Sequence, residues 1–295
     1  MIKYFNRRNR NYELENIAGG KVIKVIYNTS FGKGLLELLI KKKILSTLYG
    51  KFCDTSISRL FINRFINNFN IDINQYEKNL TEYTSFNDFF YRKLKYNSRT
   101  ICYEENNLIS PCDSKLLAIE NIHENSTFKV KGFEYKLENL INNRELADNY
   151  KSGCCLIFRL CPTDYHRFHF IDSGMCYETH RIKGSYFSVS PLALSKIGKI
   201  FCENKREYSI FKSNTFDEVL YLEVGATFVG SIIQTYKEDH LVKRGDEKGF
   251  FKFGGSTVML FFKENIIKID DDILDNSRNG IESSVYLGEK IGVRI

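Results

Sequence analysis

Short runs of β-prone residues fill the chain from about residue 96 onward, and this pattern constrains the fold most. Aromatic and aliphatic runs such as LLAIENI, CCLIFRL, EVLYLEV and TVMLFF are separated by turn residues at short intervals. Short strands at this spacing are typical of a mainly antiparallel sheet. The sequence therefore predicts an α+β protein with a mainly antiparallel β catalytic body over residues 96–295.

Residues 1–95 have a different texture and are predicted to form an N-terminal amphipathic helical region. GLLELLIKKKILSTLYGKF, from residue 34, and SRLFINRFINNF, from residue 58, place apolar residues mostly on one helical face. Such helices can lie in a membrane interface or pack on an ordinary core, and amphipathicity alone favours the core. The chain contains no run of about 18 apolar residues, so we expect no membrane-spanning helix.

Positive charge is concentrated near the N-terminus. Residues 1–51 contain eleven Lys or Arg and three Glu, whereas the whole chain has a net charge of +7. A basic end on a near-neutral body indicates an anionic partner, and each basic residue near an anionic membrane contributes about 1 kcal/mol. Eight cysteines without a CxxC pair, and no apparent signal peptide, indicate reduced thiols in a cytosolic protein.

The segment FFKFGGSTVMLFF, residues 250–262, interrupts a strand-like run with two glycines, a serine and a threonine. Glycines at this point weaken a strand, because they bury no side chain and cost backbone entropy. One interpretation is a bulge or hairpin turn. The other is a bent backbone that lets the Ser256 hydroxyl attack the carbonyl group of Gly255.

Two histidines stand in RLCPTDYHRFHFIDSG, residues 159–174, directly after an apolar strand. His166 and His169 share a face on a helix and point to opposite faces on a strand, and the sequence does not decide between these. An HxxH pair is a weak zinc signal without a third ligand, so no metal is expected. Asp113 in SPCDSK fits a plain turn acid, and FNDFFYRKLK, residues 86–95, fits a helix with a solvated basic face.

The order of these blocks is more specific than any one of them. FNDFFYRKLKYNSR, SPCDSK, RLCPTDYHRFHFIDSG, VGATFVGSI and RGDEKGFFKFGGSTVMLFF together resemble the phosphatidylserine decarboxylase family. The resemblance covers roughly residues 80–295 strongly and extends more loosely towards the N-terminus. Two departures occur: Ser114 stands where many members have Gly, and Gly254 stands where many have Leu.

The resemblance implies a proenzyme that cuts itself between Gly255 and Ser256. The products would be a large chain, residues 1–255, and a small chain, residues 256–295, whose first residue becomes a pyruvoyl group derived from Ser256. The family's base falls on His169 and its orienting acid on Asp113, which with Ser256 would form a Ser-His-Asp arrangement. His166 would lie in the substrate pocket and assist decarboxylation.

The implied reaction is a carboxy-lyase step of phospholipid biosynthesis. The pyruvoyl group would form a Schiff base with phosphatidylserine, which loses CO2 to give phosphatidylethanolamine, with no pyridoxal phosphate and no metal. The expected partners are phosphatidylserine and an anionic membrane surface, with no nucleic acid, and a homodimer remains open. The expected location is peripheral, on the cytoplasmic face of the cell membrane. Two alternatives remain: a pyruvoyl-dependent decarboxylase of another amino compound, and an unprocessed lipid-binding module.

Overall fold

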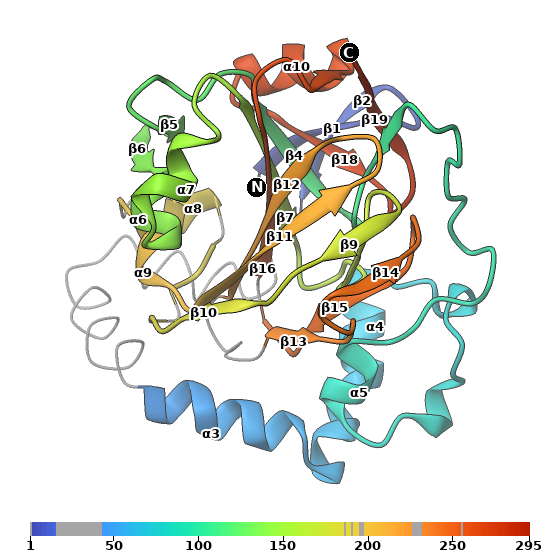
Figure 1. Ribbon diagram of the computed structural model, residues 1–295. Helices are drawn as coiled ribbons and strands as arrows, with labels where there is room; N and C mark the ends of the chain where they lie inside the picture. Colours follow the sequence, from blue (N-terminus) through green and yellow to red (C-terminus); the bar gives the residue numbers. More distant parts are fainter. Residues whose placement is uncertain are drawn as a thin grey trace.

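A large β-sheet runs through the centre of the molecule (Figure 1). The computed structural model describes residues 2–15, 43–185, 187–189, 191–194, 198–225, 232–254 and 256–295. Within these residues the large sheet has eleven strands. In spatial order ten of them are β14 (His240–Val242), β9 (Gly174–Cys176), β11 (Arg206–Ser213), β12 (Glu218–Gly225), β16 (Ser256–Phe262), β7 (Cys154–Leu160), β4 (Ser114–Ile119), β18 (Glu282–Val285), β1 (Ile2–Asn6) and β2 (Asn11–Glu15), while β10 (His180–Ile182) pairs with β11.

Three smaller sheets and short helices surround the large sheet. The smaller sheets are β13 (Ile232–Gln234), β15 (Glu247–Phe251) and β8 (Arg167–His169); β17 (Ile267–Ile269), β19 (Lys290–Arg294) and β3 (Asn107–Ile109); and β5 (Thr127–Val130) with β6 (Phe133–Lys136). The described helices are α3 (Lys43–Cys53), η1 (Ser56–Arg59), α4 (Leu60–Phe69), η2 (Ile73–Gln75), η3 (Leu80–Glu82), α5 (Phe86–Phe90), α6 (Leu137–Ile141), α7 (Arg144–Asp148), α8 (Pro191–Leu194), α9 (Ile200–Glu203) and α10 (Asp271–Arg278). The predicted α+β class is confirmed, because antiparallel pairing dominates and the helices are few.

Strand β16 is the central strand, and its composition explains its position. All seven of its residues are buried. Val258, Leu260 and Phe262 face one hydrophobic core, and Met259 and Phe261 face the other. A strand covered on both faces is expected to be apolar throughout rather than alternating, and STVMLFF has this character after its first two residues. The large sheet therefore separates two cores.

Helices α3, α4 and α5 lie at one end of the molecule, opposite α10 (Figure 1). The predicted helices are confirmed for α3 and α4, while the earlier part of the first, residues 34–42, lies outside the described residues. None of the described helices is long and apolar enough to cross a membrane. The apolar side of α4 packs inward through Ile62, which is 2% exposed.

The N-terminus differs from the predicted helical region at its start. Residues 2–15 form a hairpin of β1 and β2, and β1 pairs in parallel with β18 near the C-terminus. The sequences IKYFN and NYELE carry the alternation of a strand, and the tight turn between them places Arg10 at φ +55°. Part of the N-terminal region therefore belongs to the β-rich body.

Candidate active site

Ser256 is the first residue of β16 and lies at the centre of the large sheet. It is opposite Gly225 of β12 on one side and Leu160 of β7 on the other. The side chain is 0% exposed, and its Oγ atom has no hydrogen-bond partner within the described part of the chain. Leaving a buried hydroxyl without a partner costs about 1–3 kcal/mol, which calls for an explanation such as a chemical role. The hydroxyls of Ser114, Thr257 and Ser283 also lack partners, so this feature alone does not identify a nucleophile.

The backbone just before Ser256 has an unusual conformation. Gly254 has φ +137°, a region that residues with a Cβ rarely adopt. This explains why glycine stands here in place of a packing residue. Gly255, the other residue of the expected cleavage site, lies outside the described residues. The structure therefore describes Gly254 and Ser256, the two neighbours of Gly255.

His166 lies in the loop between β7 and β8, against the segment that leads to the glycines. Its ring packs on Phe90 at 4.0 Å between centroids, and its carbonyl oxygen accepts a hydrogen bond from the Phe251 backbone N–H. Burial lowers the pKa of His166 to about 3, although the nearby backbone groups of Asp164 and Gly254 act in the opposite direction. The Nδ1–H donates to the Asp164 carbonyl oxygen at 2.9 Å, so Nε2 carries the lone pair. No side chain of the described residues donates to this buried atom, and the ring lies beside the backbone of Gly254. His166 is therefore a neutral imidazole beside the glycine segment.

His169 is the last residue of β8 and is held from both ring nitrogens. Its Nδ1–H donates to the Gly245 carbonyl oxygen at 2.9 Å, so Nε2 accepts from the Tyr165 hydroxyl at 3.1 Å. Its backbone N–H donates to the carbonyl oxygen of Pro111, which ties β8 to the turn that carries Asp113. Burial lowers the pKa of His169, while the negative charge of Asp113 is one of the influences that raise it.

Asp113 is 4% exposed and makes most of its polar contacts with an arginine. Arg99 donates to both carboxylate oxygens, with a shortest distance of 2.5 Å, and the Leu287 backbone N–H donates to Oδ1 at 2.9 Å. The paired carboxylate raises the pKa of Arg99. A bidentate pair of this kind fixes the orientation of the carboxylate.

The structure thus brings the predicted residues together in two groups. His169 and Asp113 lie on segments joined by a backbone hydrogen bond, and His166 lies by Gly254. Among the described residues, no hydrogen bond joins His169 to Asp113 or to Ser256. Arg99 and Tyr165 are not among the predicted site residues, although both stand in the sequence blocks YNSR and DYHRFH.

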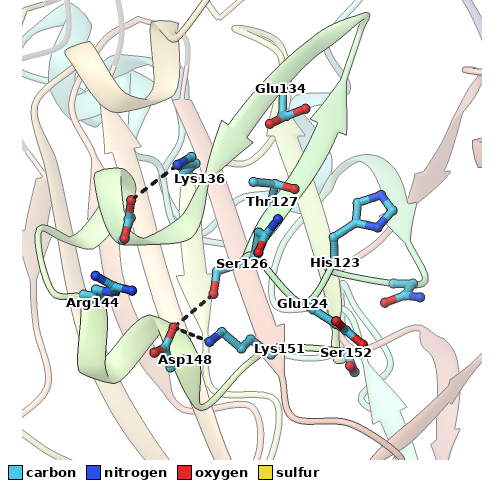
Figure 2. A pocket seen from close by; sticks show the side chains of 13 residues that line it. His123, Glu124, Ser126, Thr127, Glu134, Lys136, Arg144, Asp148, Lys151 and Ser152 are labelled. Carbon is cyan, nitrogen blue, oxygen red and sulfur yellow. Dashed lines mark hydrogen bonds and ion pairs between the residues drawn. The ribbon is translucent and has the colours of Figure 1, made fainter.

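A polar pocket lies away from the predicted catalytic residues. Figure 2 shows this pocket of about 990 Å³ next to β5, β6, α6 and α7. His123 is among its lining residues, but none of the predicted catalytic residues is. Two of the charged side chains that line the pocket, Lys151 and Asp148, form an ion pair with each other at 2.9 Å. Among the described residues, no group of three or more His, Cys, Asp or Glu side chains is placed to hold a metal ion.

Comparisons with known proteins point to one family. The family model described as phosphatidylserine decarboxylase matches residues 86–293. A protein of Clostridium botulinum (strain Langeland) named phosphatidylserine decarboxylase proenzyme is 57% identical over 99% of both chains. A protein of the same name from Clostridium tetani is 55% identical over 99% of this chain and 98% of its own length. Another from Desulfitobacterium hafniense (strain Y51) is 56% identical over 100% of this chain and 99% of its own length.

Proposed function

Because the chain belongs to the phosphatidylserine decarboxylase family, we propose that it is a self-cleaving proenzyme that converts phosphatidylserine to phosphatidylethanolamine and CO2. The observation that carries the proposal is the position of Ser256. Its hydroxyl is buried without a partner directly after the glycine segment, in a chain that matches its relatives over nearly its whole length. This favours a processed enzyme over an unprocessed lipid-binding module.

Self-cleavage would use the chain's own groups. The Ser256 Oγ atom attacks the carbonyl carbon of Gly255 while a neutral histidine takes the hydroxyl proton. The C–N bond then breaks, which leaves an ester and a free amino group on Ser256. Removal of the Ser256 Cα proton expels the Gly255 carboxylate, and water replaces the nitrogen, which leaves as ammonia. These steps end with a pyruvoyl group at position 256.

We assign the proton transfer in this cut to His169, with Asp113 as its supporting charge. Hydrogen bonds to Gly245 and Tyr165 fix the ring and its tautomer, and burial keeps it neutral, so Nε2 carries the basic lone pair. Asp113 acts on His169 through its charge, because Arg99 occupies its oxygens. Taking up the Ser256 proton requires Nε2 to exchange the Tyr165 hydroxyl for Ser256.

The residues around position 256 fit a pyruvoyl group, since Ser256 is the first residue of β16 and can become a chain end without disturbing the strand. When formed, this group supplies an electrophilic carbonyl that accepts the substrate's amino group and takes up the electron pair left by CO2. His166 would serve this second stage. Its Nε2 atom carries the lone pair and can hold a proton, which it returns to the carbon from which CO2 departs.

The substrate resides in a bilayer, and the helical end offers a surface for one. Ile57, Leu60 and Phe61 are 64%, 80% and 48% exposed on neighbouring turns of η1 and α4. Arg59 and Arg64 are exposed beside them. Exposed apolar side chains interspersed with basic ones are typical of helices that lie in a membrane interface. We propose that this end docks on an anionic membrane surface, on the cytoplasmic face.

The proposal can be tested on purified full-length protein. We expect intact mass to reveal two chains, with the smaller one, residues 256–295, lacking a free amine. Vesicles containing phosphatidylserine should release CO2, and borohydride added together with the substrate should stop turnover by trapping the imine. A single uncut chain that releases no CO2 would refute the proposal. A cut protein active on another amine but not on phosphatidylserine would support the alternative substrate.

A further inference from the structure

Helix α5 contacts both sides of the proposed cleavage machinery. Residues 86–95 are predicted from the sequence to form a helix with a solvated basic face. The structure shows instead that α5 and Arg92 are buried. Four of the five residues of α5 are buried, and Arg92, just beyond it, is 1% exposed. Arg92 donates to the carbonyl oxygens of Thr163 and Asp164 at 2.9 and 3.3 Å, within the loop that bears His166. This block therefore shapes the site.

The segment that precedes the scissile bond is held by the same helix. Phe253 packs edge-on against Phe86 and Phe90, with ring centroids 5.0 and 4.9 Å apart. Its backbone N–H donates to Asn87 Oδ1 at 2.8 Å. Phe253 is thereby fixed in position and direction two residues before Gly255.

Asn87 has its orientation determined by both ends of its amide. Oδ1 accepts from the Phe253 N–H, while Nδ2 donates to Asp54 Oδ1 at 2.9 Å. Only the amide oxygen can accept from the Phe253 N–H, and only the amide nitrogen can donate to Asp54. Both contacts therefore require the same orientation of the Asn87 amide. Asp54 also pairs with Lys252 at 3.2 Å, so α3, α5 and residues 252–253 form one connected unit around a side chain that is 1% exposed.

We propose that Asn87 is a positioning residue for self-cleavage, an inference that rests on the proposed function. The Asn87 side chain fixes Phe253 on one side of the expected cleavage site, and β16 fixes Ser256 on the other. These two anchors would limit the orientations in which the Gly255 carbonyl can meet the Ser256 hydroxyl. A misplacement of about 1 Å in such a geometry can lower a rate about 100-fold.

The test compares rates of self-cleavage in the full-length chain, followed by intact mass after a pulse of synthesis. Asn87→Leu keeps the side-chain size but can neither accept nor donate, and we expect it to slow the cut by about 10- to 100-fold. In the double variant Asn87→Asp with Asp54→Asn, the carboxylate at position 87 can accept from the Phe253 N–H. The amide at position 54 can donate to the same carboxylate. We expect this double variant to recover most of the rate.

A matched control separates positioning from folding. Asn107→Leu removes a buried asparagine that bonds to Glu104, away from the glycine segment, and should cut at the parent rate. The unfolding midpoint of each uncut chain should be measured alongside. Asn87→Leu that cuts as fast as the parent would overturn the inference, as would a double variant that folds but stays as slow as Asn87→Leu. If the parent itself remains uncut, the proposed function fails instead.

Discussion

The two histidines of the DYHRFH block have the same tautomer but differ in the contacts of their Nε2 atoms. Each donates from Nδ1 to a backbone carbonyl oxygen, so each presents its lone pair at Nε2. In His169 that lone pair accepts from Tyr165, whereas in His166 no side chain among the described residues donates to it. A histidine held in this way can take up a proton without first changing tautomer, which is what a general base requires.

Substitution of the site residues separates the cut from the later reaction. We expect Ser256→Ala and His169→Ala to remain uncut, because they lose the nucleophile and a base that contributes about 100- to 10,000-fold. His166→Ala should be cut but should release CO2 slowly. Intact mass and CO2 release measure the two stages. An uncut His166→Ala together with a cut His169→Ala would exchange the roles of the two residues.

Acid should destabilise the uncut chain through these same buried rings. The pKa of His166 is about 3 in the folded chain and about 6.5 when unfolded, so below pH 6.5 the unfolded state binds more protons. Stability is therefore lost as pH falls from 6.5 towards 3. From pH 7 to 5 His166 should account for about 2 kcal/mol of unfolding free energy, and His169 acts in the same direction.

Urea unfolding of the Ser256→Ala chain at pH 7 and pH 5 measures this loss. In the same background, His166→Gln should remove about 2 kcal/mol of the difference between the two pH values. An unchanged difference would mean that the ring is not buried in its neutral form.

The sequence predicts which residues form the site but does not reveal their hydrogen bonds. The residues themselves draw attention to Ser256, His166 and His169, whereas the catalytic roles of these three and of Asp113 rest on the resemblance. The contact between Asp113 and Arg99 could not be anticipated, because it depends on how a loop 14 residues upstream folds back. Such contacts are set by tertiary packing, which leaves no periodic signal in the chain.

At the scale of elements, the helices near the N-terminus bury apolar side chains on one side and expose others on the opposite side. The inner side of α4 is anchored through Ile62, whereas Leu60 is 80% exposed. Apolar periodicity predicted these helices, since it depends only on spacing. It did not distinguish core packing from membrane contact, because both produce the same pattern.

Removing apolar side chains from the outer face should weaken membrane binding. We expect Ile57→Asn with Leu60→Asn to reduce binding to phosphatidylserine-containing vesicles at least about 10-fold, since full burial of each side chain contributes about 1.5–3 kcal/mol. Vesicle flotation measures the bound fraction. Leu241→Asn on β14 is a matched control, because Leu241 is 81% exposed outside the helical end. Equal losses in both variants would exclude a specific docking surface.

At the scale of the whole molecule, the proposed small chain is interleaved with the large one. β16 lies between β12 and β7, and β18 lies between β4 and β1. A cut before Ser256 leaves these strand pairs intact, so the two chains should stay together without a covalent link. The predicted boundary at residues 95/96 did not anticipate that the N-terminal hairpin joins this sheet. Its two strands are short, and their alternation is less prominent than the basic residues around them.

Arg7 also shows that part of the N-terminal positive charge faces the protein. Its guanidinium contacts Asp270, Asp272 and Glu289 at 2.6–2.9 Å, and its side chain is 12% exposed. These carboxylates all belong to residues 256–295. The positive charge of Arg7, which the sequence predicts to face an anionic membrane, is instead paired with carboxylates of the proposed small chain.

Loss of Arg7 should therefore loosen the small chain after the cut. Arg7→Leu removes the cation that Asp272 contacts, while Asp270 keeps Lys290 and Glu289 keeps the more distant Arg8. Removing one partner of a buried pair costs about 3–5 kcal/mol, less for a site that is partly exposed. We expect the urea concentration that releases residues 256–295 to fall clearly, as measured by size-exclusion chromatography of the cut protein. Arg278→Leu is the control, because its pair with Glu120 is exposed and solvent screens such pairs. If both variants release the small chain at the same urea concentration, the N-terminal hairpin does not hold the two chains together.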